Sequence, residues 1–176
     1  MVELSDGSLL VGVSQGSFTG SNSSLLRLAD TDADGIADQQ KILAANIPIS
    51  SMSDVRLVDD LVFVTGQRQP IQIFRLGNRP TDPLANVGEI KLGYPAGGWL
   101  HPHSALAAVP SAATDDAVDL YFQVGSDRNF AETTRKVSFE GLGIERTPMN
   151  GDSVYRVTIV DTGTELIASD ITQIAT

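Results

Sequence analysis

The sequence predicts an all-β protein. Its apolar residues fall in short runs that alternate with polar residues, which is the pattern of half-buried strands. These runs recur at intervals of roughly ten residues. The 16 Gly and 8 Pro residues supply frequent turns between them. Strands at this spacing are typical of a sandwich, a barrel or a propeller.

Each expected strand is an apolar run bounded by turn residues or a polar loop. The first lies within residues 2–14, where the run 9–13 follows a Ser-Asp-Gly turn. Asp59 and Asp60 separate two runs so closely that they predict a tight hairpin. The runs that predict strands beyond the first are 24–28, 40–44, 55–58, 61–65, 70–76, 89–92, 105–109, 120–124, 153–159 and 164–168. Residues 133–139 and 170–175 are the only candidates for a helix.

The chain reads as one domain built from three similar units. Their expected boundaries are residues 1–48, 49–98 and 99–176. An apolar-apolar-Arg-apolar pattern marks the third strand of each unit, at residues 25–28, 73–76 and 154–157. Repeats of about 40–50 residues have the size of a propeller blade. We therefore predict about three four-stranded blades, with chance similarity among Leu- and Val-rich strands as the alternative.

Composition excludes several classes of partner. The formal net charge is −10, with 22 acidic and 12 basic residues, which disfavours binding to nucleic acid or to an anionic membrane surface. It suits a neutral or cationic small molecule, or a divalent cation. The absence of cysteine excludes disulfides and thiolate metal sites. No run approaches the ~20 apolar residues of a membrane span, and no signal-peptide pattern is present, so the sequence leaves the compartment open.

The two histidines of the chain precede the run at 105–109. His101 is a candidate general base, because histidine alone has an unperturbed pKa near neutrality. A histidine that caps the end of a strand is the alternative. His103 is the second candidate, because a spacing of two places it on the same face of a strand. Together they could bind a metal, although no further ligands lie nearby in the sequence.

A polar loop at residues 125–129 follows the second strand of this hairpin. It could present Arg128 or Asn129 to a ligand near His101. The alternative is a simple turn in which Asn129 adopts the left-handed conformation.

These features resemble the glucose/sorbosone dehydrogenases, a family of quinoprotein β-propellers. A blade of that family has a histidine and an apolar strand, then Leu-Tyr and a Val-Gly-Ser-x-x-Asn loop, and after an insertion a Val-Tyr-Arg-Val strand. This chain has the same pieces in the same order over residues 101–160. The resemblance extends more weakly over most of the chain.

The resemblance implies the oxidation of a sugar or an alcohol with pyrroloquinoline quinone. It implies that His101 takes the proton of a substrate hydroxyl and that Arg128 and Asn129 contact the cofactor. Trp99, the single tryptophan, could stack on a sugar or quinone ring, but a position wedged between blades is the favoured alternative. Members of the family are commonly periplasmic or secreted.

Two departures from the family pattern shape what we expect of this chain. A longer loop at residues 110–116 replaces a Pro-Asp-Gly turn. The chain also ends at Thr176, before the Gly-Leu-Arg-Asn-Pro segment that carries the family's active-site arginine and asparagine. About six blades are usual, so we expect half a propeller whose open faces favour a homodimer. A non-catalytic calcium-stabilised ligand- or protein-binding module and a truncated product without activity are the alternatives.

An acidic loop in the first unit matches the first nine positions of an EF-hand calcium loop. The expected ligands are the side chains of Asp30, Asp32, Asp34 and Asp38 and the carbonyl oxygen of Ile36. Gly35 permits the sharp turn, but Lys41 stands at position twelve, where a bidentate glutamate is usual. We expect a structural calcium site of reduced affinity. The alternative is a hairpin whose aspartates cap their own backbone.

Overall fold

The protein is described here by a computed structural model of residues 1–14 and 22–176, which form fourteen strands and no helix. The strands make three antiparallel sheets, each of them open. The all-β prediction is confirmed. Within these residues, no helix has the length and apolar character needed to cross a membrane.

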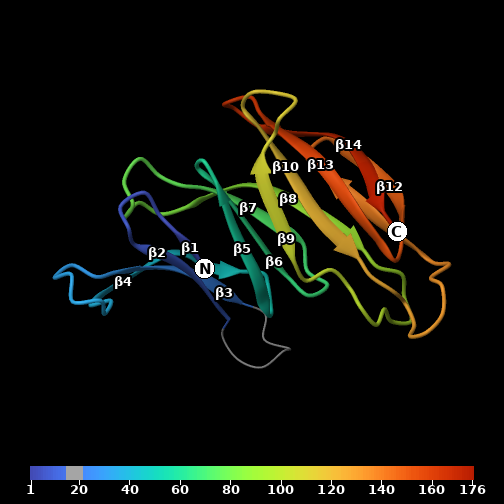
Figure 1. Cartoon of the computed structure of the whole chain (residues 1–176), viewed down its shortest axis with the longest axis horizontal. Helices are drawn as coiled ribbons and strands as arrows, with labels where there is room; N and C mark the ends of the chain where they lie inside the picture. Colours follow the sequence, from blue (N-terminus) through green and yellow to red (C-terminus); the bar gives the residue numbers. More distant parts are fainter. Residues whose placement is uncertain (15–21) are drawn as a thin grey trace.

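The sheets follow one another along the chain (Figure 1). Sheet 1 has the order β1-β2-β3-β4 and contains β1 (Val2–Glu3), β2 (Leu9–Ser14), β3 (Ser23–Ala29) and β4 (Gln39–Ile47). Sheet 2 has the order β12-β11-β8-β7-β6-β5 and contains β5 (Met52–Val58), β6 (Leu61–Gly66), β7 (Ile71–Arg75), β8 (Ala85–Gly93), β11 (Lys136–Gly141) and β12 (Ile144–Asn150). Sheet 3 has the order β14-β13-β10-β9 and contains β9 (Leu106–Pro110), β10 (Ala117–Val124), β13 (Ser153–Asp161) and β14 (Leu166–Ala175).

Sheet 2 is the middle layer because its two faces belong to different hydrophobic cores. Val62 and Val64 on β6 pack with the apolar residues of sheet 1, which we call the first core. Leu61 and Phe63 point to the other face and pack with sheet 3 in the second core. Successive side chains of a strand point to opposite faces, so β6 is buried on both sides. Figure 1 shows the blue strands of sheet 1 and the orange and red strands of sheet 3 on opposite sides of the molecule.

The first strands of neighbouring sheets lie side by side. Along β5 and β9, Ser53 Oγ donates to the carbonyl of Ser104 (2.6 Å), and Asp54 Oδ2 accepts from the backbone N–H of Leu106 (2.8 Å). Arg56 Nε donates to the Leu106 carbonyl (2.9 Å). Residue numbers rise together in these contacts, so β5 and β9 run in the same direction. The side chains of β5 thereby satisfy backbone groups at the open edge of β9.

This arrangement separates the strand connections into two ends of the molecule. One end carries residues 94–105, which lead to β9, together with the β6–β7 turn and the β10–β11 loop. It is called the histidine end below. The other end carries residues 30–38, the β5–β6 turn, the β9–β10 loop and the β13–β14 loop. It is called the aspartate end.

Neither of the two helix candidates forms a helix. Residues 136–139 lie in β11 and residues 170–175 lie in β14. In β11, Val137 and Phe139 are buried in the second core while their neighbours face outward, which is the period of a strand. The hairpin β11–β12 was not expected. It comes from the stretch between the second and third strands of sheet 3, yet it joins the outer edge of sheet 2 through β8.

The recurring arginine lies on the third strand of each sheet, but its environment differs. Arg27 on β3 bonds to Asp6 (2.6 Å), and Arg75 on β7 bonds to Asp60 (2.7 Å). Each of these aspartates lies in the turn between the first and second strands of its own sheet. Arg75 also reaches Asp161 of sheet 3 (2.7 Å) and so ties two sheets together. Arg156 on β13 lies opposite Tyr121, in the middle of its sheet.

Candidate functional site

His101 lies at the histidine end with an exposed side chain, in the loop that precedes β9. Its backbone N–H donates to the Ser126 carbonyl (3.0 Å), and its Nε2 lies 2.8 Å from Asn129 Oδ1. A side chain at Gly125 would come within 2.2 Å of the His101 carbonyl oxygen, so the close approach of the two loops requires glycine there. Contacts to the 125–129 loop thus hold the imidazole in place.

The hydrogen bond to Asn129 selects one form of the imidazole. An amide oxygen only accepts, so in the neutral ring Nε2 carries the proton and donates it. Nδ1 is then left with a lone pair. A side chain that is exposed, oriented by a neighbour and basic at one nitrogen has the properties of a general base.

His103 does not share the surroundings of His101. Residues 101–105 precede β9, so the prediction that the two histidines lie on the same strand face is wrong. The His103 side chain is 0% exposed, and its Nε2 lies 2.7 Å from the Gln69 carbonyl, which fixes the proton on that nitrogen. Tyr94 Oη lies 2.8 Å from Nδ1 and also accepts the His103 backbone N–H.

Burial defines the chemistry of His103. It lowers the pKa of the imidazole to about 4, although the hydrogen bond to Gln69 acts in the opposite direction. The ring stacks on Tyr94, with 5.7 Å between centroids. A neutral ring with both nitrogens bonded inside the protein is a structural element and does not serve as the second candidate for catalysis.

Arg128 and Asn129 are both exposed in the β10–β11 loop, next to His101. The Arg128 side chain is 50% exposed, and its Nε bonds to Asp127 (3.2 Å). Asn129 does not adopt the left-handed conformation that the turn interpretation expected, because the positive φ belongs to Phe130 (57°). The Phe130 side chain is fully exposed beside this pair.

Trp99 lies in the second core and is only 3% exposed. Its indole N–H donates to the Gly125 carbonyl (3.1 Å), and its ring meets Tyr94 edge-on, with 5.4 Å between centroids. The Arg135 guanidinium lies 5.9 Å from the ring centroid. With its ring covered in this way, Trp99 supports the loops of the site and offers no face on which a ligand could stack.

Arg68 is a site residue that the sequence analysis missed. It lies in the β6–β7 turn with a positive φ of 67°, and it bonds to the Trp99 carbonyl. Arg68 lines a pocket of about 220 Å³ with Leu100 and Pro102, the two neighbours of His101 in the chain. The turn contains no local pattern that indicates this contact, because the partner lies 31 residues away.

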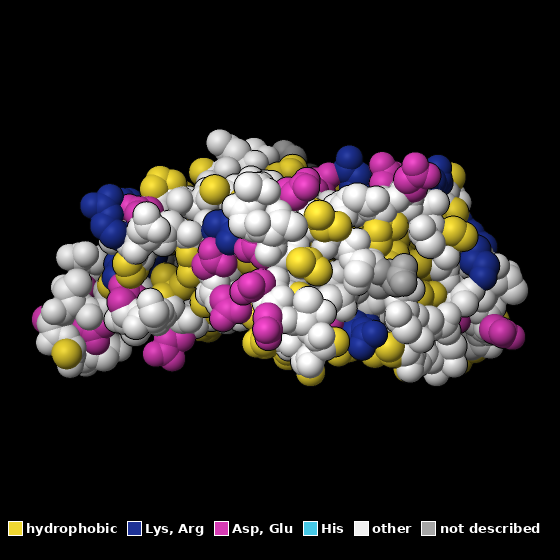
Figure 2. All heavy atoms as spheres, turned by 90° about the horizontal axis from the view of Figure 1, so that it is seen from above, with side chains coloured by type: hydrophobic (Ala, Val, Ile, Leu, Met, Phe, Trp, Pro, Cys, Tyr) yellow, Lys and Arg dark blue, Asp and Glu magenta, His cyan; other side chains and the backbone are white. Residues whose placement is uncertain are grey.

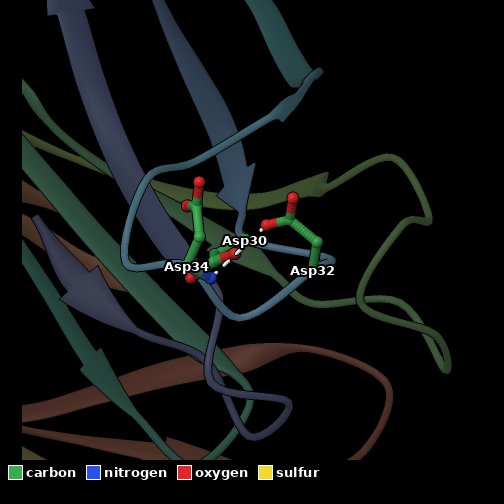
Figure 3. A group of neighbouring side chains, drawn as sticks. All are labelled: Asp30, Asp32 and Asp34. Carbon is green, nitrogen blue, oxygen red and sulfur yellow. Dashed lines mark hydrogen bonds between the residues drawn. The ribbon is translucent and has the colours of Figure 1, made fainter.

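The acidic loop lies at the opposite end of the molecule, between β3 and β4. Asp30, Asp32 and Asp34 bring carboxylate oxygens within 4.8 Å of one another. Figure 3 shows the three side chains on this loop. The backbone N–H of Gly35 donates to Asp30 (2.8 Å), and that of Ile36 donates to Asp34 (2.8 Å). Both features expected from the sequence are therefore present: a carboxylate cluster and aspartates that cap their own backbone.

Asp38 is not part of this cluster. Its two carboxylate oxygens accept from the Thr31 side chain (2.5 Å) and backbone (3.0 Å), and these bonds lower the pKa of Asp38. The Ile36 side chain is 71% exposed. Because the loop lies at the aspartate end, a cation bound there would not reach a ligand at His101.

Comparisons of the chain with protein-family models, with curated proteins and with solved structures found no match. A function for this chain therefore rests on its own residues and their geometry.

Proposed function

We propose that the chain is a sector of a β-propeller that binds a sugar or another alcohol at its histidine end, with His101 as the general base. The observation that carries the proposal is the His101–Asn129 pair, an exposed imidazole whose Nε2 lies 2.8 Å from Asn129 Oδ1. The resemblance to the glucose/sorbosone dehydrogenases implies that His101 corresponds to their catalytic histidine.

The order of the strands supports the propeller. Four strands of each sheet follow a meander, if the hairpin β11–β12 is set aside as an insertion. The first strands β5 and β9 are adjacent and run in the same direction. Blades arranged around a common axis have both properties, because their first strands line the axis and their faces pack on one another.

The residues at the histidine end fit part of a quinone site. Arg128 and Asn129 present a cation and an amide beside His101, and these groups suit the carboxylates and carbonyls of pyrroloquinoline quinone. Trp99 does not fit, because it is buried. When bound, the quinone supplies a two-electron acceptor. Nδ1 of His101 would accept the proton of the substrate hydroxyl, and Asn129 would hold the ring.

A dye-reduction assay tests this proposal. With pyrroloquinoline quinone, calcium and an aldose, the wild-type chain should reduce the dye, and His101→Gln should lower the rate by about 10²–10⁴-fold, the usual contribution of a general base. Glu145→Gln, an exposed position on β12 towards the aspartate end, should keep the wild-type rate. An inert wild-type mixture, or an unchanged rate in His101→Gln, would reject the assignment.

A second candidate function is a calcium-stabilised binding module, and the Asp30–Asp32–Asp34 cluster is the observation that favours it. Three carboxylates within 4.8 Å repel one another unless a cation lies among them. Lys41 at position twelve removes the usual bidentate ligand, so we expect a weak site with a Kd of about 10⁻⁴–10⁻³ M.

Calcium at about 10 mM should therefore raise the melting temperature by roughly 3–10 °C, because the cation binds only the folded loop. Asp34→Asn should abolish this rise. Asp38→Asn removes the same charge from a residue that bonds to Thr31, and it should keep most of the rise. Differential scanning fluorimetry with calcium, magnesium and EDTA measures these shifts. Equal responses of the two variants would argue against the cluster as the site.

A further inference from the structure

Sheet 1 has an open apolar face on the side away from sheet 2. A Cβ atom at Gly12 would meet Met52 and Val55 of sheet 2, so the neighbouring side chains of Val11 and Val13 point the other way. Residues paired across an antiparallel ladder share a face. The strand pairing therefore places the following apolar side chains together on the open face: Leu9, Val11, Val13, Leu26, Leu28 and Ile42. Of these, Leu9, Val13 and Ile42 are 37%, 39% and 57% exposed.

Sheet 3 has an open face of its own on the side away from sheet 2. Leu120 and Phe122 on β10 point into the second core, so Tyr121 points outward. Pairing places Val109 and Ile167 on the same outward side, where they are 45% and 41% exposed. Hydrophobic side chains lie among polar ones on the surface in Figure 2. The stack of sheets therefore ends in an unpaired face on each side.

The two open faces differ in whether they hold the recurring arginine, as do the faces that pack together within the chain. The face of sheet 1 that holds Arg27 packs on the face of sheet 2 that does not hold Arg75. In the same way, the face of sheet 2 that holds Arg75 packs on the face of sheet 3 that does not hold Arg156. Arg156 lies on the open face of sheet 3, opposite Tyr121. The open face of sheet 3 therefore holds the recurring arginine, and the open face of sheet 1 does not. These are the two kinds of face that pack together within the chain, but the two sheets lie at opposite ends of it.

The exposed charges on these faces also have opposite signs. Glu3 pairs with Leu9 and is exposed on the open face of sheet 1. Arg156 is partly exposed on the open face of sheet 3. Asp119 shares that face, but it is 7% exposed and accepts a hydrogen bond from Thr158 (2.5 Å). Contact between the faces therefore covers both apolar surfaces and places groups of opposite charge in the same interface.

We propose that a second copy of this chain covers both open faces, with sheet 3 of each copy packed on sheet 1 of the other. The two contacts are identical and related by a two-fold axis, so the assembly closes at two copies. This inference depends on the sheet faces and not on the chemistry at His101. The net charge of −10 on each copy opposes association, so the dimer should become tighter as salt is added.

Sedimentation equilibrium of the full chain tests the proposal. The wild type should be a dimer at micromolar concentration. Its dissociation constant should decrease as the NaCl concentration is raised from 50 mM to 500 mM. Ile42→Glu on sheet 1 and Val109→Glu on sheet 3 should each weaken the dimer by roughly 100-fold, because a carboxylate would be buried in an apolar contact. Both side chains are already largely exposed in one chain, so the fold should tolerate the change. Thr147→Glu adds the same charge at an exposed position on β12 and should leave the dimer intact.

Mixing the two variants separates this arrangement from others. Ile42→Glu keeps an intact sheet 3 and Val109→Glu keeps an intact sheet 1, so together they should form a heterodimer through one unaltered contact. A monomeric wild type would overturn the proposal. A Val109→Glu variant that dimerises as the wild type does would overturn it too, because sheet 1 would then pair with sheet 1.

Discussion

Replacing Phe63 with alanine should lower the free energy of unfolding by about 3–5 kcal/mol, the usual cost of removing a buried phenylalanine. The side chain is 0% exposed and lies on β6, in the middle sheet, where it packs in the second core. A domain of ordinary stability has only about 5–15 kcal/mol in total. Denaturation by urea, followed by circular dichroism, measures the change.

Phe130→Ala is the matched control for this experiment. The same group is removed, but the Phe130 side chain is fully exposed, so the expected change is within about 0.5 kcal/mol. Sheet 2 contributes to both cores, so both should unfold in one transition. A loss below about 1 kcal/mol in Phe63→Ala would contradict the burial of this face of β6 in the second core.

Acidification should destabilise the protein between pH 6.5 and about pH 4 through His103. Burial lowers its pKa from 6.5 to about 4 in the folded state, so in this range the unfolded chain binds a proton that the folded chain does not. The stabilising contribution is complete above pH 6.5 and is lost as the pH falls through this window. A shift of this size corresponds to about 3 kcal/mol. Urea unfolding at several pH values measures it.

His103→Gln should remove this dependence on pH, because glutamine does not titrate and can still donate a hydrogen bond to the Gln69 carbonyl. His101→Gln is the control and should retain the parent's pH dependence, because it leaves His103 in place. A parent chain whose stability stayed constant from pH 6.5 to pH 4 would contradict the buried, neutral His103.

Local pattern was sufficient to predict most strands. Asp59 and Asp60 were predicted to form a tight hairpin turn, and they separate β5 from β6. The hairpin β11–β12 was missed, although Val137 and Phe139 alternate with polar residues and Gly141 and Gly143 mark a turn. The stretch was considered only as a candidate helix, so this alternation was not interpreted as a strand. Its place in sheet 2 could not be predicted, since β8 pairs with β11 across more than 40 residues of chain.

The nearness of His101 to the 125–129 loop was predictable from the sequence, but the surroundings of His103 and Trp99 were not. The identity of His101 and its nearness to Asn129 follow from two loops at the ends of adjacent strands. The burial of His103 depends on Tyr94 and on the carbonyl of Gln69, which lies 34 residues earlier in the sequence. Trp99 is likewise buried by distant contacts. Such contacts leave no local signal, so sequence periodicity cannot distinguish a ligand-facing ring from a core ring.

The hairpin β11–β12 has a consequence for dissecting the protein. Its chain segment lies between β10 and β13 of sheet 3, but Val137, Phe139 and Met149 pack in the second core and its strands extend sheet 2. The hairpin thus links the chain segment of sheet 3 to the edge of sheet 2. Ending the chain at the predicted boundary, residue 98, would remove the hairpin and leave the backbone groups at the edge of β8 unpaired. Strands β5–β8 should therefore not fold as an isolated fragment unless the hairpin β11–β12 is included with them.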